Sequence, residues 1–173
     1  MGRLIYVTGG ARSGKSRFAQ QLAEQQPGDL LYIAPAQVLD PEMADRVEQH
    51  RLARGERWTL LEEPLQLAER LAQIADGKSA LLLDCVTIWL SNLFFHFDEE
   101  QELIIAAVER LTSLVDSLPA PLYMVSNEVG SGIVPENAMA RSFRDLAGAV
   151  NQQLATAADE AWLVVSGLPL RLK

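Results

Sequence analysis

Hydrophobic positions along the chain follow two alternating patterns. Short, nearly continuous apolar runs are typical of strands buried on both faces of a parallel sheet, and apolar spacing of three and four residues is typical of one helix face. The apolar runs predict strands at residues 4–8, 30–34, 80–86, 121–126 and 161–166, with a short edge strand at 168–172. The helical spacing predicts helices at residues 16–25, 43–53, 63–75, 103–118 and 137–157. This alternation predicts an α/β fold with a mainly parallel central sheet flanked by helices.

Length and composition favour a single globular domain. The chain has 173 residues, of which 49% are hydrophobic and 22% charged, and these values are ordinary for one globular domain. We find no linker, repeat or low-complexity segment, so we predict one catalytic domain over residues 1–173. The net charge of −8 argues against sequence-independent nucleic-acid binding, because such binding depends on lysines and arginines that neutralise phosphates.

The single cysteine and the N-terminus predict the cellular compartment. Cys85 lies in an apolar run, where a buried, inert thiol is expected, and it has no second cysteine with which to form an internal disulfide. No apolar stretch approaches the roughly 18 residues of a membrane span. The glycine-rich turn at Gly9 leaves no room for a signal peptide. We therefore expect a cytoplasmic protein without a membrane span.

A glycine-rich turn follows the first predicted strand. Its residues match G-x-x-x-x-G-K-[ST] at every fixed position, and they are Gly9, Gly10, Ala11, Arg12, Ser13, Gly14, Lys15 and Ser16. In such a turn, backbone N–H groups and the start of the next helix hold phosphate oxygens. Lys15 is expected to reach the β- and γ-phosphates, and the Ser16 hydroxyl to ligate Mg²⁺. The motif predicts a P-loop NTPase fold that binds a nucleoside triphosphate with Mg²⁺.

Polar residues also end two other predicted strands. Asp84 interrupts the apolar run at 80–86, near the edge where open parallel sheets bind ligands, and a carboxylate there suits a metal site. A helix cap or a paired core aspartate is the alternative for Asp84. Asn127 and Glu128 follow the strand at 121–126 and are expected to face the same crevice, although a turn role is equally compatible with their position.

The chain has two histidines, and their surroundings differ. His50 lies in a polar helical segment close to three arginines, whose charges could hold a triphosphate. From the residues alone, a solvated helix face remains the alternative for this segment. His96 follows two phenylalanines and is expected to pack or cap near an aromatic cluster.

Several separate segments together resemble one enzyme family. They are YVTGGARSGKSRFA, DPEMADRVEQHRLARGERW, LLLDCVTIWLSNL, VSNEVGSGIVPENAMARSFRDLAGAVNQQLA and DEAWLVVSGLPLRLK. The chain is thereby similar, over nearly its whole length, to the bifunctional adenosylcobinamide kinase and adenosylcobinamide-phosphate guanylyltransferase of cobalamin biosynthesis. The stretch NEVGxGIVPEN and the histidine-arginine segment are more specific to this family than a P-loop alone.

The resemblance implies two reactions and a set of site residues. A triphosphate phosphorylates the aminopropanol hydroxyl of adenosylcobinamide, and GMP then passes from GTP, through a guanylylated histidine, to adenosylcobinamide phosphate. The implied histidine is His50, and neutral imidazole is a good nucleophile at cellular pH. The resemblance implies further nucleotide contacts at Ala34, Pro35, Ala36, Arg51, Leu52, Ala53, Arg54, Glu62 and Asp84. From the residues alone, Glu62 would be a solvated loop carboxylate or a cap of the next helix.

The implied cofactor is Mg²⁺, the substrates are GTP and ATP with the two corrinoids, and the implied assembly is a homotrimer. Because one P-loop serves both reactions, the helix that carries His50 is expected to move between them. Three alternatives remain open. They are an unrelated small-molecule P-loop kinase without a covalent nucleotide, a nucleotide-dependent regulatory switch, and a member that retains only guanylyl transfer.

Overall fold

The structure is a computed structural model that describes residues 2–36 and 55–173. Within these ranges the strands are β1 (Leu4–Gly9), β2 (Leu30–Ala34), β3 (Trp58–Glu62), β4 (Ala80–Asp84), β5 (Leu122–Asn127), β6 (Glu160–Val165) and β7 (Leu168–Arg171). The helices are α1 (Lys15–Glu24), α3 (Leu67–Ile74), α4 (Val86–His96), α5 (Gln101–Leu114) and α6 (Ala138–Ala157), and a 3₁₀ turn, η1 (Val115–Ser117), follows α5.

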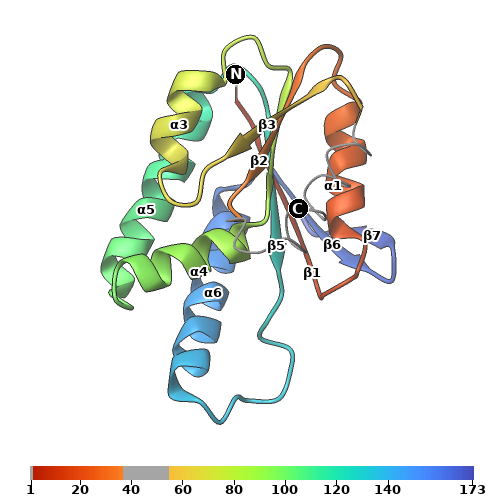
Figure 1. Ribbon diagram of the computed structural model, residues 1–173. Helices are drawn as coiled ribbons and strands as arrows, with labels where there is room; N and C mark the ends of the chain where they lie inside the picture. Colours follow the sequence, from red (N-terminus) through yellow and green to blue (C-terminus); the bar gives the residue numbers. More distant parts are fainter. Residues whose placement is uncertain (1, 37–54) are drawn as a thin grey trace.

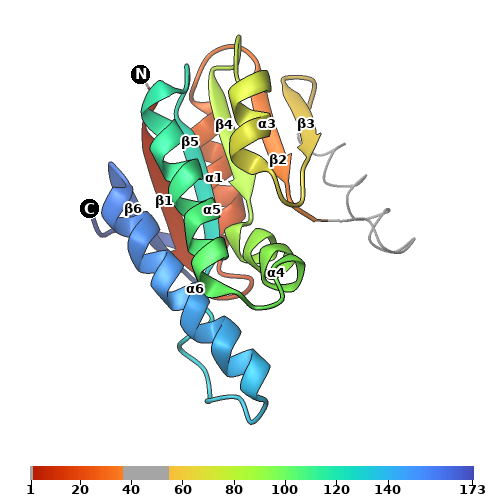
Figure 2. The same cartoon turned by 90° about the vertical axis from the view of Figure 1, so that its left-hand side faces the viewer.

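The described strands form one sheet of seven strands in the order β3-β2-β4-β5-β1-β6-β7. Neighbouring strands are parallel except β6 and β7, which form an antiparallel hairpin at one edge. Helix α1 covers one face, while α3, α4, α5 and α6 cover the other (Figures 1 and 2). The prediction of a mainly parallel sheet flanked by helices is confirmed.

The central strands are apolar throughout because both of their faces are covered. In β4, the side chains of Leu81 and Leu83 pack under α3, α4 and α5, while Leu82 packs under α1. All three residues are fully buried. Removing such side chains from water is the main source of folding free energy, which explains the unbroken apolar run in the sequence.

The sequence pattern missed strand β3 and helix α4. Strand β3 lies at the sheet edge and buries only Leu61 fully, so it lacks a continuous apolar run. Helix α4 buries one face, at Val86, Trp89, Leu90, Leu93 and Phe94, but its exposed residues Ile88 and Phe95 are apolar as well, so the polar face of an amphipathic helix is missing from the sequence pattern. The strand predicted at 80–86 ends at Asp84, where the chain turns into α4.

The remaining predicted elements lie close to their expected positions. The strand at Leu30–Ala34 is confirmed with its bounds, and β7 is the predicted edge strand. The helix predicted at 63–75 begins at Leu67, because the Glu63 carboxylate accepts hydrogen bonds from the N–H groups of Leu65 and Gln66 in a preceding turn. The helix predicted at 43–53 lies outside the described residues.

Candidate nucleotide-binding site

The glycine-rich turn lies between the end of β1 and the start of α1, and two of its glycines, Gly9 and Gly14, are sterically required. Gly14 has a φ of 95°, a conformation that L side chains rarely adopt, and a Cβ there would lie 3.2 Å from the Gly167 Cα. A Cβ on Gly9 would come within 2.4 Å of the Val164 carbonyl oxygen. The turn therefore packs directly against β6 and the β6–β7 turn.

Hydrogen bonds fix the curl of the turn. The Ser13 N–H donates to the Gly10 carbonyl at 3.2 Å, and the Phe18 N–H donates to the Gly14 carbonyl at 3.0 Å. The first N–H groups of a helix have no carbonyl partner within it, so those at the start of α1 remain available to an anion. The helix dipole adds partial positive charge at the same point.

Lys15 carries the positive charge of this cradle. The residue is only 7% exposed, and its Nζ donates to the Gly10 carbonyl at 3.1 Å. A buried ammonium held by one carbonyl oxygen lacks the hydration it would have in water, so phosphate oxygens are favourable partners. The Ser13 hydroxyl beside it is buried without a hydrogen-bond partner among the described residues.

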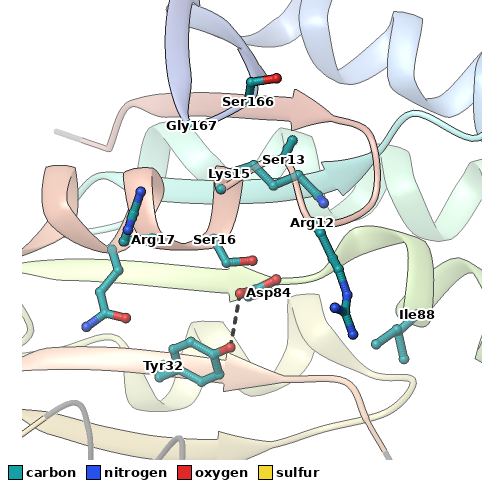
Figure 3. Close-up of a pocket in the computed structure, with 12 residues that line it drawn as sticks. Arg12, Ser13, Lys15, Ser16, Arg17, Tyr32, Asp84, Ile88, Ser166 and Gly167 are labelled. Atoms are coloured by element: carbon teal, nitrogen blue, oxygen red, sulfur yellow. Dashed lines mark hydrogen bonds between the residues drawn. The ribbon is translucent and has the colours of Figure 1, made fainter.

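Asp84 ends β4 on the same edge of the sheet. Its carboxylate accepts a hydrogen bond from the Tyr32 hydroxyl at 3.2 Å (Figure 3). It does not cap α4, because the cap residue is Cys85 and no side-chain cap bond forms there. Cys85 is buried, as predicted, and burial raises the pKa of its thiol. The thiol next to Asp84 is therefore neutral at cellular pH.

One cavity of about 860 Å³ joins these groups. It is lined by Arg12, Ser13, Gly14, Lys15, Ser16, Arg17, Gln20, Tyr32, Asp84, Ile88, Ser166 and Gly167. The Ser16 hydroxyl and the Asp84 carboxylate face it together, and such oxygen donors suit Mg²⁺. The described residues contain no group of three or more acidic, His or Cys side chains suited to a metal. Phosphate-bound Mg²⁺ needs only one or two protein ligands beside the phosphates, so the donors present fit this ion.

The other predicted contacts lie at the same sheet edge, outside this cavity. Ala34 and Glu62 pair across the ends of β2 and β3, and the Pro35 carbonyl accepts a hydrogen bond from the Asn92 side chain at 2.8 Å. Glu62 is exposed and does not cap the next helix, since that turn is held by Glu63. The predicted residues His50, Arg51, Leu52, Ala53 and Arg54 lie outside the described residues.

Asn127 and Glu128 do not line the cavity, contrary to the expectation that they face it. The Asn127 N–H donates to the Thr87 hydroxyl, and the Glu128 carboxylate accepts from the Gly130 N–H at 2.7 Å, which is a turn role. His96 ends α4, with its ring 4.8 Å from the Phe97 ring between centroids. The expectation of an aromatic neighbour for His96 is confirmed.

The sequence pattern did not identify several cavity residues. Tyr32, Arg17, Gln20, Ile88, Ser166 and Gly167 all line the cavity. In the sequence, Tyr32 is a single hydroxyl within an apolar strand, which does not by itself indicate a site. Ser166-Gly167 indicates a turn, but the sequence does not show which segment that turn contacts. Their position follows from the strand order, which local patterns do not contain.

A strand, a glycine-rich turn and a helix that begins with a buried lysine, at the carboxyl edge of a parallel sheet, define a P-loop nucleotide-binding protein. A solved structure supports the fold: the RadB recombinase superposes with a TM-score of 0.55 at 14% identity, covering 93% of this chain and 73% of that one. Residues 5–172 match the CobU family, described as cobinamide kinase / cobinamide phosphate guanyltransferase, and the chain belongs to this family.

Three similar proteins agree with this assignment. The bifunctional adenosylcobalamin biosynthesis proteins CobU of Escherichia coli and Salmonella typhimurium are 44% and 43% identical, over 98% of this chain and 99% of each relative. The corresponding protein CobP of Pseudomonas aeruginosa is 41% identical over 96% of this chain and 95% of its own length. The predicted family and the predicted class of bifunctional transferase in cobalamin biosynthesis are confirmed. The family acts on cobinamide with a nucleotide substrate.

Among the described residues, no helix has the length and apolar character needed to cross a membrane.

Proposed function

We propose that this chain catalyses two successive steps on one corrinoid. A nucleoside triphosphate phosphorylates the aminopropanol hydroxyl of adenosylcobinamide, and GMP from GTP is then joined to that phosphate, which yields adenosylcobinamide-GDP. The observation that carries the proposal is the buried Lys15 in a complete P-loop, facing the same cavity as Asp84, in a chain of this family. The proposal treats residues 1–173 as one catalytic domain.

For the kinase step, we assign the phosphates to the P-loop. The N–H groups at the start of α1 and the Lys15 ammonium stabilise the negative charge on the β- and γ-phosphates as the γ-phosphoryl group transfers. Ser16 and Asp84 are the residues that would hold Mg²⁺, which neutralises phosphate charge when bound. Tyr32 keeps the Asp84 carboxylate in place through its hydroxyl.

For the guanylyl step, we assign the nucleophile to His50. The imidazole attacks the α-phosphate of GTP, a nitrogen–phosphorus bond forms, and pyrophosphate leaves. A phosphate oxygen of adenosylcobinamide phosphate then displaces the histidine. Support from the described residues comes from Ala34, Pro35, Ala36 and Glu62, which lie together at one edge of the sheet beside Asp84.

We further propose that the chain forms a homotrimer, as the family resemblance implies. The β6–β7 hairpin offers apolar side chains for association, because Val165, Leu168, Leu170 and Leu172 are 56%, 73%, 59% and 58% exposed. Such a concentration of exposed apolar side chains is typical of an interaction surface. Light scattering on the purified protein tests this, and a monomeric mass at working concentration would contradict it.

The first experiment supplies Mg²⁺ and GTP labelled at the α-phosphate, denatures the protein and measures label on the chain. We expect acid-labile label, as for a phosphoramidate, and its loss in His50→Ala. The control is His96→Ala, which removes the other histidine, an exposed one on α4, and should retain the label.

The outcomes separate the alternatives. No retained label, with γ-phosphate transfer to adenosylcobinamide intact, would mean a kinase alone. Label without γ-phosphate transfer would mean a guanylyltransferase alone. No turnover in the absence of a partner protein would favour a regulatory switch.

A further inference from the structure

Arg12 is a cation of the P-loop whose side chain has no partner in the part of the chain that the structure describes. It lines the nucleotide cavity together with Lys15 and Asp84. Figure 3 shows its side chain extending from the P-loop toward Ile88, on the side of the cavity where Asp84 lies. No hydrogen bond or ion pair joins its guanidinium to another described residue. A guanidinium carries five N–H donors and stays charged, so this one is available to an anion in the cavity.

The backbone holds Arg12 in an uncommon conformation. The Ser13 N–H donates to the Gly10 carbonyl at 3.2 Å, which closes a turn with Ala11 and Arg12 at its centre. Arg12 has a φ of 56°, and a positive φ at this position of a turn favours glycine or asparagine. Left-handed residues with long side chains are strained, and such residues cluster at active sites and ligand clamps. An arginine at a position that glycine would occupy with less strain points to a role for its side chain.

Phosphoryl transfer creates a need for further positive charge in this cavity. In the kinase step, the acceptor hydroxyl oxygen bonds to the γ-phosphorus, the bond from that phosphorus to the β–γ bridging oxygen breaks, and the hydroxyl proton is released to water. Negative charge is then spread over several phosphate oxygens. Lys15 supplies one compact charge, held at 3.1 Å from the Gly10 carbonyl oxygen. The planar fork of a guanidinium can donate two parallel hydrogen bonds to phosphate oxygens, which an ammonium cannot do.

The residues that would hold Mg²⁺ indicate which phosphate Arg12 faces. Mg²⁺ bridges the β- and γ-phosphates in P-loop enzymes, and Ser16 and Asp84 are the residues assigned to it here. The γ-phosphate is therefore expected on the Asp84 side of the cavity, toward which Arg12 extends. Arg12 and Asp84 form no ion pair with each other. The charge of the guanidinium thus remains available to phosphate, and that of the carboxylate to the metal ion.

We propose that Arg12 is a catalytic residue of the kinase step. Its guanidinium donates to oxygens of the γ-phosphate and stabilises the charge that develops on them as the phosphoryl group transfers. This role belongs to the side chain, and it differs from the contacts that P-loop backbone N–H groups make with any bound phosphate. The inference rests on the proposed bifunctional activity.

A kinetic test compares Arg12→Gly with Arg12→Lys. Glycine removes the guanidinium and suits the left-handed backbone. We expect kcat for γ-phosphate transfer to adenosylcobinamide to fall about 100-fold in Arg12→Gly, with the KM for the triphosphate within about threefold, as loss of an interaction made only in the transition state requires. Arg12→Lys keeps the charge without the fork, so its kcat should lie between those of Arg12→Gly and the native protein. Added guanidinium ion should raise the rate of Arg12→Gly and not that of the native protein.

The matched control is Glu99→Gly. Glu99 is exposed and also left-handed, with a φ of 67°, but it does not line the cavity. Its replacement should leave the transfer rate unchanged and insensitive to guanidinium ion. Denaturant titration should show that Arg12→Gly is at least as stable as the native protein, which separates catalysis from folding. A raised KM with unchanged kcat, a rate loss accompanied by lower stability, or no rescue by guanidinium ion would overturn the proposal.

A binding test examines the transition state without turnover. ADP with Mg²⁺ and aluminium fluoride imitates the γ-phosphoryl group during transfer, and GDP is tested in parallel. We expect fluoride to tighten diphosphate binding to the native protein, and Arg12→Gly to weaken that complex about 100-fold, because transition-state analogues report differential binding. The affinity of Arg12→Gly for a non-hydrolysable triphosphate should stay within about threefold of native. Equal weakening of both complexes would mean that Arg12 only binds nucleotide, contrary to the proposal.

The two proposals can fail separately. If the native protein transfers no γ-phosphate to adenosylcobinamide, but the gain from aluminium fluoride depends on Arg12, the catalytic role of Arg12 stands and the cobinamide kinase assignment fails. If the native protein transfers γ-phosphate to adenosylcobinamide, and both the rate and the fluoride gain persist in Arg12→Gly, the activity stands and the role of Arg12 is wrong.

Discussion

The two sides of the P-loop are connected to it in different ways. The β6–β7 turn is tied to the cradle by a backbone hydrogen bond from Gly167 to Ser13 and by close packing against Gly14. On the other side, Asp84 and Tyr32 meet the cradle across the cavity, and the contact between them is a single hydrogen bond between side chains. Backbone contacts fix the β6–β7 turn. The position of the Asp84 carboxylate depends instead on side-chain orientation, which a substitution or a ligand can change.

The largest effect is expected at Lys15, which lies between the β6–β7 turn and Asp84. Lys15→Ala removes the buried ammonium that stabilises phosphate charge, and we expect both transfers to fall by about 10²–10³-fold in kcat/KM. Rates of γ-phosphate transfer and of His50 labelling measure this. The matched control is Lys78→Ala, whose ammonium donates to the Thr59 hydroxyl far from the cavity lining, and it should leave both rates unchanged. Loss of one transfer with the other intact would show that Lys15 serves a single reaction.

An intermediate effect is expected where backbone packing ties the β6–β7 turn to the P-loop. Gly14→Ala places a Cβ on a left-handed residue and 3.2 Å from the Gly167 Cα, so the free energy of unfolding should fall by about 1–2 kcal/mol. Denaturant titration measures the change. Gly148→Ala is the matched control, because a Cβ there meets nothing within 4 Å in the middle of α6, and it should stabilise by about 0.5–1 kcal/mol. If both variants shifted stability in the same direction, the packing argument would be wrong.

The smallest effect is expected on the side of the cavity that holds Tyr32 and Asp84. Tyr32→Phe keeps the ring and removes the hydroxyl that holds Asp84, a net contribution of about 1 kcal/mol for a typical hydrogen bond. We expect the Mg²⁺ concentration for half-maximal nucleotide affinity to rise about fivefold. Tyr123→Phe removes a hydroxyl whose partner is the Leu22 carbonyl, on the same face of the sheet, and should not alter the Mg²⁺ dependence. An unchanged Mg²⁺ requirement in Tyr32→Phe would remove Tyr32 from the positioning of Asp84.

The features that could be predicted from the sequence are those that depend on neighbouring residues in the chain. The apolar run of β4 reflects burial on both faces, and the P-loop motif reflects the backbone conformation at Gly14 and the buried positive charge of Lys15. Strand β3 was missed because only one residue of this edge strand is buried, which leaves little apolar signal, and helix α4 was missed because apolar residues on its exposed face, Ile88 and Phe95, hide the periodicity of its buried face. The pairing of Tyr32 with Asp84 depends on β2 lying beside β4, which no local pattern reports.

The cavity residues from the end of the chain illustrate the same limit. The hairpin turn at Ser166 was recognisable as a turn, but its contact with the P-loop comes from β6 pairing with β1 across a long sequence separation. The carboxylate that accepts hydrogen bonds in the turn before α3 belongs to Glu63 and not to Glu62. The two glutamates are adjacent, and the pattern of charges alone does not distinguish between them.

Burial of Cys85 also bears on how the protein withstands oxidants. The thiolate is the form that peroxide and alkylating reagents attack, and burial keeps this thiol protonated by raising its pKa, with the Asp84 charge adding to the same effect. The residue next to the cavity carboxylate is thus sheltered from the modification that inactivates many enzymes with exposed cysteines. The chain has no other cysteine, so its phosphate chemistry should persist without a reductant in the medium.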